Sequence, residues 1–241
     1  MTSFTEEYVK GNKIALALQH VAIGYNRQKT NQPYWAVKDV SFRVRQGETL
    51  GVIGRNGAGK STLLRLMAGL IKPDKGLFIN FGHTVSLLSL NLGFIQDLTG
   101  RENAILGGIL LGMRKKDIEA KIPDIIEFSE LGDFIDQPIS TYSSGMSARL
   151  GFSIAFQADP DILLVDEVLG VGDAEFHQKS TAIMKERIKS NKTIVFVSHN
   201  ENLIKELCDR VVWIEHGMTK KRGIPETVLQ AYNEYHHVRR K

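Results

Sequence analysis

The sequence predicts an α/β fold of one domain, in which helices alternate with the strands of a largely parallel sheet. Three observations predict this class. A glycine-rich stretch at residues 54–61 lies between an apolar run and a helix-like run, and two later apolar runs, at residues 162–165 and 194–197, end in polar or charged residues. The 241 residues, 42% of them apolar, can bury one sizeable core, so two full domains would be crowded.

Two strands are expected ahead of the glycine-rich stretch, at residues 14–21 and 36–44. The second alternates apolar and polar residues, which is the period of a strand with one buried face. A polar segment at residues 25–33 joins them. We therefore expect an antiparallel β flap that leads into the glycine-rich stretch.

Residues 54–61 read Gly-Arg-Asn-Gly-Ala-Gly-Lys-Ser, which is a glycine, four free positions and then Gly-Lys-Ser. Glycine reaches φ values that other residues avoid, so successive N–H groups can point into one concavity and hold phosphate oxygens. Lys60 then supplies a charge for the β- and γ-phosphates, and the Ser61 hydroxyl can ligate Mg²⁺. The residues expected to bind a nucleotide here are Gly54, Arg55, Asn56, Gly57, Ala58, Gly59, Lys60, Ser61 and Thr62.

Three aromatic residues, Tyr25, Tyr34 and Trp35, stand at the edges of the polar segment in the flap. One of them could stack on an adenine, while packing against the flap accounts for the other two. Tyr25 is our candidate, and the choice among the three stays open. The loop motif alone does not separate a kinase, a GTPase, a helicase and a transporter.

Composition excludes several other classes. The net charge is +4, but 31 basic and 27 acidic residues are interspersed, so a nucleic-acid partner is not indicated. Basic clusters at residues 220–222 and 239–241 are interpreted as a solvated tail or, less directly, as a segment near an anionic membrane. The single cysteine, Cys208, excludes an internal disulfide and is expected to be a buried, inert thiol. No signal peptide or membrane span is expected, so a membrane role would come through a partner.

The middle of the chain is expected to be helical. After a strand at residues 77–81, a helical subdomain is inserted at about residues 85–140, and a helix at 147–158 extends it. Thr99 and Glu102 have the spacing of a capping box. A strand at residues 210–217 and a closing helix at about 225–235 complete a single domain over residues 1–241.

Two predicted strands carry candidate catalytic residues at their carboxyl ends. The apolar run at residues 162–165 precedes Asp166, which can hold the Mg²⁺ shell, and Glu167, which can orient or deprotonate the attacking water. A second strand, at residues 193–197, ends shortly before His199. Beside a phosphate loop, this histidine becomes a candidate γ-phosphate contact.

These segments, in this order, resemble the nucleotide-binding subunit of an ATP-binding-cassette (ABC) transporter, whose fold is a P-loop NTPase core with an antiparallel β flap and an inserted helical subdomain. The resemblance spans nearly the whole chain and implies an ATPase with ATP and Mg²⁺ as ligands. It makes Glu167 the catalytic base and His199 the γ-phosphate sensor. The matching positions are the Walker A loop at 54–61, the signature at Ser143, Ser144, Gly145 and Met146, the Walker B strand at 162–167, and Asp173 in the D-loop.

Two departures from the family pattern stand out. The signature usually has a glycine at the position of Ser144 and a glutamine at that of Met146. The family's glutamine loop is also unclear, because Gln96 comes several residues too late and Ser89 or Leu90 lies nearer the expected place.

The chain has one phosphate loop and one signature, and the family closes each ATP site with the signature of the facing subunit. We therefore expect a second copy of the chain as partner, with two ATP molecules between the copies. An integral membrane permease subunit, in two copies, is the other expected partner. This places the chain at the cytoplasmic face of the plasma (inner) membrane as a peripheral protein.

Residues 87–94, 98–103, 142–150 and 168–176 resemble the branch of the family that exports polysaccharides. That branch moves lipid-linked O-antigen, capsular polysaccharide or teichoic acid across a bacterial cytoplasmic membrane. No carbohydrate-binding domain is expected after residue 235, so the lipid-linked glycan would be an indirect substrate. The alternatives are an exporter of drugs or small solutes, a soluble ABC ATPase not linked to transport, and a small-molecule kinase, which would have no use for the signature.

Overall fold

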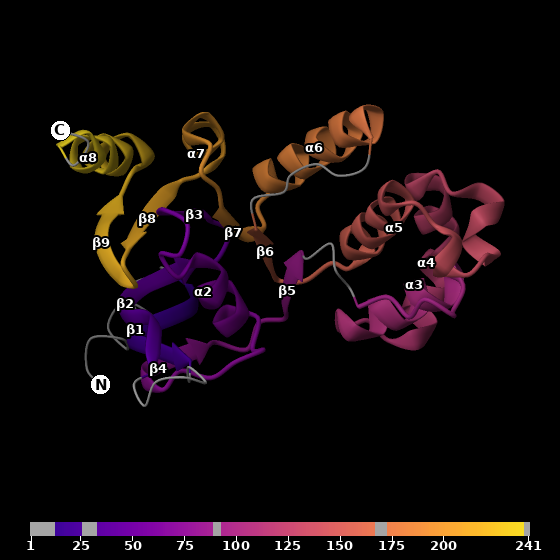
Figure 1. Ribbon diagram of the computed structural model, residues 1–241, viewed down its shortest axis with the longest axis horizontal. Coiled ribbons are helices and arrows are strands. Elements are labelled where there is room, and N and C mark those ends of the chain that lie inside the picture. The colour runs from indigo at the N-terminus through magenta and orange to yellow at the C-terminus, as the bar shows by residue number, and fades with distance from the viewer. Residues whose placement is uncertain (1–12, 26–32, 89–92, 167–172, 239–241) are drawn as a thin grey trace. The chain divides into compact units, whose positions relative to one another are not determined.

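The chain forms two compact units (Figure 1), each with its own hydrophobic core. The computed structural model describes residues 13–25, 33–88, 93–166 and 173–238. The first unit comprises Met1–Leu87, Asp161–Glu167 and Ile188–Lys241, and the second comprises Leu88–Pro160 and Val168–Arg187.

The strands in the described ranges join into one sheet of nine strands, in the order β4-β1-β2-β9-β8-β3-β7-β6-β5. This mixture of strands and helices confirms the predicted α/β class. The strands are β1 (Ile14–Tyr25), β2 (Tyr34–Arg45), β3 (Thr49–Ile53), β4 (Lys75–Asn80), β5 (Val85–Leu88), β6 (Ile162–Asp166), β7 (Thr193–Val197), β8 (Arg210–Glu215) and β9 (Met218–Gly223).

The N-terminal strands form the expected flap. β1 pairs antiparallel with β2 and with β4, and its register places Tyr25 opposite Tyr34. Both β1 and β2 are longer than the sequence predicted, at 12 residues each. The extra length comes from cross-strand pairing, which extends each strand beyond its apolar run.

The central strands bring the predicted site residues to one edge of the sheet. β3 runs parallel to both β7 and β8, and β6 runs parallel to β7. All residues of β3 and β7 are buried, as expected of parallel strands covered on both faces. Because parallel strands end at the same edge, the loop after β3, the end of β6 and the segment after β7 lie at that edge.

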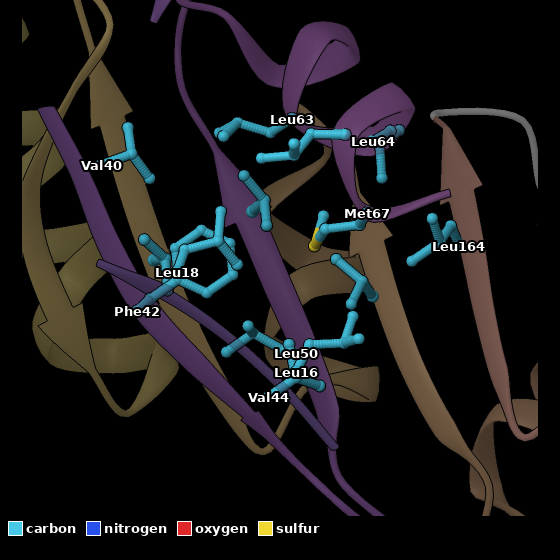
Figure 2. Close-up of a cluster of buried hydrophobic side chains, with 14 of the residues drawn as sticks. Leu16, Leu18, Val40, Phe42, Val44, Leu50, Leu63, Leu64, Met67 and Leu164 are labelled. Carbon is cyan, nitrogen blue, oxygen red and sulfur yellow. The ribbon is translucent and has the colours of Figure 1, made fainter. Parts of the chain in front are cut away.

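Helix α2 (Lys60–Met67) belongs to the hydrophobic core of the first unit. Its side chains Leu63, Leu64 and Met67 share one buried cluster with Leu50 of β3 and Phe42 of β2 (Figure 2). Helix α2 contacts both β2 and β6. The flap and the parallel strands are therefore packed on the same helix, the one that begins at the phosphate loop. The remaining helices of this unit are α7 (Glu201–Leu207) and α8 (Pro225–Val238).

The second unit is helical. Thr99 caps its first helix, accepting a hydrogen bond from the Glu102 N–H at 3.2 Å, while Glu102 Oε2 accepts one from the Thr99 N–H at 2.8 Å. The predicted capping box is therefore confirmed. Buried side chains such as Ala104, Ile118 and Leu150 join three of the helices in one core. The elements are α3 (Gly100–Leu110), α4 (Lys115–Ser129), η1 (Gly132–Asp136), η2 (Ile139–Thr141), α5 (Ser144–Gln157) and most of α6 (Ala174–Lys189).

Two segments differ from the sequence prediction. The expected helical block begins with a strand, β5, next to β6 in the sheet. The carboxylate of Asp161, just before β6, accepts hydrogen bonds from the N–H and hydroxyl of Thr84 at 2.7 and 2.8 Å, and so fixes the start of β5. With four residues, β5 is too short to show a period in the sequence.

The basic cluster at residues 220–222 is the second correction. It lies in β9, which is between β2 and β8, and is not a solvated tail. The segment has few apolar residues and therefore no strand pattern. Its hydrogen bonds come from neighbours on both sides, including a pairing of Arg222 with Val212 and a bond from the Arg222 guanidinium to the Ser41 carbonyl at 3.2 Å.

Two other expectations concern single residues or helices. Cys208 is buried with 8% of its surface exposed, and burial raises the pKa of its thiol to about 12, which fits an inert thiol. In the described ranges, none of the helices has both the length and the apolar character needed to span a bilayer.

Candidate functional site

The loop between β3 and α2 has the backbone that a phosphate cradle needs. Gly54, Gly57 and Gly59 all have positive φ, at 155°, 79° and 103°. A Cβ on Gly54 would lie 2.1 Å from the Ile214 carbonyl oxygen, and one on Gly59 would lie 2.6 Å from that of Ala36. Only glycine fits at these two places, because the loop passes so close to β8 and β2.

Helix α2 begins at Gly59 without a side-chain cap. The first N–H groups of a helix have no intrahelical partner, and they carry the positive end of its dipole. The start of α2 is therefore open to an anion. Arg55, Asn56 and Gly57 form the exposed tip of the loop ahead of it.

The Lys60 side chain is folded into this loop. Its ammonium group donates to the carbonyl oxygens of Gly54 at 2.8 Å and Arg55 at 3.3 Å, and only 7% of the residue is exposed. A buried ammonium needs such partners, because desolvation of an isolated charge is costly. The charge of Lys60 is therefore held within the loop, where a phosphate could approach it.

Ser61 and Asp166 meet across the first unit. The Ser61 hydroxyl donates to Asp166 Oδ2 at 3.2 Å, which joins the start of α2 to the end of β6. A hydroxyl and a carboxylate are oxygen ligands of the kind that Mg²⁺ prefers, together with phosphate oxygens and water. The pair therefore fits the predicted metal site. Among the described residues, no group of three or more His, Cys, Asp or Glu side chains is placed to hold a metal ion.

A cleft of about 500 Å³ lies beside the first half of the loop. His199, which follows β7, lines this cleft together with the loop. Other residues of its wall come from the end of β8, the turn after it and α8. The lining consists of residues 54–58, His199, Glu215, His216 and Tyr232.

The three candidate adenine-stacking aromatics lie at one end of the flap. Tyr25 and Tyr34 are cross-strand partners with 39% and 43% of their surface exposed. Trp35 is half-buried, with the Lys75 ammonium 5.0 Å from its ring centre. Tyr25 and Tyr34 are therefore more exposed than Trp35, whose ring has a cation beside it.

The signature residues begin helix α5 in the second unit. Ser143 is the N-cap, and its hydroxyl accepts a hydrogen bond from the Met146 N–H at 3.1 Å. Ser143 and Ser144 are exposed, and a Cβ on Gly145 would meet only the Ser143 hydroxyl, at 3.7 Å. A helix start that is open and accessible in this way can accept an anion.

Asp173 is tied to the signature helix within the second unit. Its carboxylate accepts a hydrogen bond from the Phe176 N–H at 3.0 Å and pairs with Nη2 of Arg149, a residue of α5, at 3.1 Å. The hydrogen bond from Phe176, and then the charge of Arg149, lower the pKa of Asp173. Arg149 also lies 3.6 Å from Glu130, which pairs with Lys179. Asp173 therefore stays charged and holds the start of α6 to α5.

Some expected site residues lie outside the described residues. They are Glu167, the candidate catalytic base, and Ser89 and Leu90, the alternatives for the glutamine loop. Gln96 is described and exposed, and its carbonyl accepts a hydrogen bond from the Ser140 N–H at 3.0 Å.

A glycine-rich loop, a lysine folded into it and a serine–aspartate pair at the end of a neighbouring strand define a P-loop nucleotide-binding protein. The model of the ABC transporter family matches residues 37–170. The chain belongs to this family.

Its relatives include two groups of export proteins. The O-antigen export system ATP-binding protein RfbB of Klebsiella pneumoniae is 51% identical over 83% of this chain and 82% of its own length. The teichoic acids export ATP-binding protein TagH of Lactococcus lactis is 47% identical over 88% of this chain, and the match spans 45% of TagH. These relationships confirm the predicted resemblance to the polysaccharide-exporter branch.

Solved structures confirm the fold. An ATP-binding cassette that was solved as a dimer, in a post-hydrolysis state with ADP and Pi, matches with a TM-score of 0.71. The match covers 87% of this chain and 98% of that chain at 21% identity. The predicted P-loop core with its antiparallel flap and helical subdomain is therefore an ABC ATPase fold.

Sequence reasoning missed part of the site. It did not single out Tyr232, Glu215 or His216 as neighbours of the loop, or Arg149 as the partner of Asp173. Tyr232 lies far from the loop in sequence and reaches it only because α8 packs on β8. The sequence holds one weak indication of the role of Arg149, because it is a charged residue in a largely apolar helix.

Proposed function

We propose that this chain is the ATP-binding and ATP-hydrolysing subunit of an ABC exporter that moves a lipid-linked polysaccharide across a bacterial cytoplasmic membrane. The polymer is of the O-antigen, capsular polysaccharide or teichoic acid type. The assignment of ATPase activity rests on the contact between Ser61 and Asp166, next in the chain to the buried Lys60. The likeness to RfbB and TagH supports the class of polymer.

The chain's own residues supply the parts of a phosphoryl-transfer site. The loop N–H groups and Lys60 bind the phosphates, and Ser61 and Asp166 would hold Mg²⁺, which neutralises charge on the phosphates. Glu167 follows Asp166 directly, and it orients and deprotonates the attacking water. His199 contacts the γ-phosphate from the same cleft as the loop.

Two copies of the chain form the working unit. Each phosphate loop is closed by Ser143, Ser144 and Gly145 of the facing copy, and Asp173 lies at the same interface. The γ-phosphate bridges the two copies, so ATP binding closes the dimer and hydrolysis releases it. A dimeric cassette with the same fold supports this arrangement.

The second unit carries an apolar surface suited to a membrane subunit. On α3, Leu106, Ile109 and Leu110 have 39%, 42% and 75% of their surface exposed. Ile95, in the segment before α3, is exposed by 49%. Contiguous exposed apolar side chains favour a protein contact. We place the permease, in two copies, against this surface, which locates the chain at the cytoplasmic face of the membrane.

Co-expression with a multi-span permease subunit from the same organism tests the proposal. We expect the two to co-purify with a bound lipid-linked glycan, and deletion of the chain to remove a surface polysaccharide. Leu110→Glu should reduce co-purification without changing ATP binding, with Glu119→Lys, on the exposed face of α4, as the control. Deletion that leaves surface glycans intact and abolishes efflux of a drug or small solute would favour the other exporter class. Full function without a membrane subunit would favour a soluble ATPase.

A further inference from the structure

The C-terminal helix α8 contributes to the nucleotide cleft. Its residue Tyr232 lines the same cleft as the phosphate loop and His199, although the family's motifs all lie earlier in the chain. The half of the loop that faces this cleft is residues 54–58, and residues 60–62 are not part of the lining. Because His199 is the proposed γ-phosphate contact, this cleft is at the end of the triphosphate that lies farthest from the adenine.

The Tyr232 ring is fixed from two sides. It packs edge-on against Trp213 of β8, with ring centres 5.5 Å apart at 85°, and against His236, one helical turn later, at 4.4 Å. A ring held by two such contacts loses little rotamer freedom when a ligand binds. The Tyr232 ring is therefore preorganised to contact a ligand in the cleft.

The buried carboxylate of Glu215 contacts the residues that pack on the Tyr232 ring. Glu215 is only 1% exposed, and its Oε2 accepts a hydrogen bond from the Trp213 indole at 3.2 Å. The imidazoles of His236 and His216 each lie 3.5 Å from this carboxylate. Glu215 therefore holds the Trp213 indole by a hydrogen bond and lies beside His236, and the rings of both residues pack on Tyr232.

The Tyr232 hydroxyl is available as a donor. The structure gives it no hydrogen-bond partner among the described residues. Burial raises the pKa of Tyr232, and the charge of Glu215 adds to this rise while that of Arg55 opposes it. The phenol therefore keeps its proton near neutral pH, and a protonated hydroxyl can donate to a phosphate oxygen.

We propose that Tyr232 is a further nucleotide-binding residue, whose hydroxyl donates a hydrogen bond to the terminal phosphate of ATP, and that Glu215 is its positioning residue. The inference rests on the proposed nucleotide site. It makes α8 part of the ATP pocket, so a partner that moved this helix would change ATP affinity.

Binding of AMP-PNP and ADP, each with Mg²⁺, to the purified full chain tests the proposal by calorimetry. Tyr232→Phe removes only the hydroxyl. We expect it to weaken AMP-PNP binding by about five- to tenfold, the effect of one lost hydrogen bond, and to leave ADP binding unchanged. Glu215→Gln should weaken AMP-PNP binding in the same direction, with an unchanged far-UV circular dichroism spectrum.

Tyr235→Phe is the matched control, because Tyr235 also packs on Trp213, at 5.1 Å, but does not line the cleft. This variant should bind both nucleotides as the unaltered chain does. Equal effects of Tyr232→Phe and Tyr235→Phe, equal losses for AMP-PNP and ADP, or no loss at all would overturn the inference. Failure of the unaltered chain to bind either nucleotide would instead count against the proposed function.

Discussion

The ammonium group of Lys60 is bonded to the Gly54 and Arg55 carbonyls of its own loop, so its charge is placed before any phosphate arrives. Lys60→Ala removes this charge and leaves the glycine backbone in place. We expect ATP affinity to fall by about 10- to 100-fold, the range for a hydrogen bond to a charged group. Calorimetry measures the loss, and Lys116→Ala, an exposed lysine of α4, is the control. Unchanged ATP binding by Lys60→Ala would contradict the phosphate cradle.

Glu167 follows Asp166, whose carboxylate is fixed at the end of β6 by the contact with Ser61. Glu167→Gln removes the proposed base but keeps the phosphate-binding groups. We expect this variant to bind ATP and to accumulate as a closed dimer, which size-exclusion chromatography with ATP would detect. Rapid ATP turnover by Glu167→Gln would exclude this residue as the base.

Among single residues, the sequence predicted those whose role follows from a local pattern. Lys60 and Ser61 follow from the loop spacing, and Asp166 follows from its place after four apolar residues. In the structure, Ser61 contacts Asp166, and Lys60 is folded into the loop. Tyr232 and Arg149 depend on how α8 packs on β8 and how α5 lies beside the start of α6. No local pattern in the sequence encodes such contacts between distant elements.

At the level of elements, α3 begins with a capping box, in which the side chains of Thr99 and Glu102 each accept a hydrogen bond from the other residue's backbone N–H. Thr99→Ala should lower the free energy of unfolding by about 1 kcal/mol, measured by urea denaturation. Thr141→Ala, whose hydroxyl bonds to the Pro138 carbonyl in a 3-10 turn, is a control outside any capping box. An equal effect of both substitutions would argue against a specific cap.

The contribution of this cap to the stability of the folded chain should depend on pH. Hydrogen bonds from the Thr99 backbone N–H and hydroxyl lower the pKa of Glu102. A carboxylate with a lowered pKa stabilises the folded state above its ordinary pKa and loses that contribution as pH falls through the lowered value. The difference in stability between the native chain and Glu102→Gln should therefore shrink on acidification below about pH 4. A constant difference down to pH 2 would contradict this.

Helices α5 and α6 are linked by the ion pair between Arg149 and Asp173. Arg149 lies four positions after Gly145 of the signature, and Asp173 directly precedes α6. Arg149→Ala should lower the ATPase rate, because the signature helix and the predicted D-loop would lose their connection. ATP affinity should stay the same, since the phosphate loop belongs to the other unit. Steady-state kinetics separate the two effects, and a raised KM with unchanged kcat would refute the connection.

Strands with a continuous apolar run were predicted well, and those without an apolar pattern were not. β3, β6 and β7 are apolar runs buried in the sheet, and their positions agree with the sequence. β5 has only four residues and β9 is mostly polar, so each is a strand because of the neighbours that pair with it. The strand propensity of single residues gives no information about which strands pair.

At the level of the whole molecule, one chain carries one phosphate loop and one signature. We expect the ATPase rate per chain to rise with protein concentration, because two copies must meet to complete each site. Measuring the rate during serial dilution gives the dependence. A rate per chain that stays constant to concentrations where only monomers remain would contradict the two-copy site.

Strand β9 has a consequence for the order in which the chain is made. It lies between β2 and β8, and Asp39 of β2 pairs with Met218. During translation the ribosome releases β1, β2 and β4 long before β9 exists, so the newly made flap must wait for nearly the whole polypeptide before its open edge is covered. Premature termination ahead of residue 218 would leave that edge exposed in a nascent chain, where chaperones would be expected to bind.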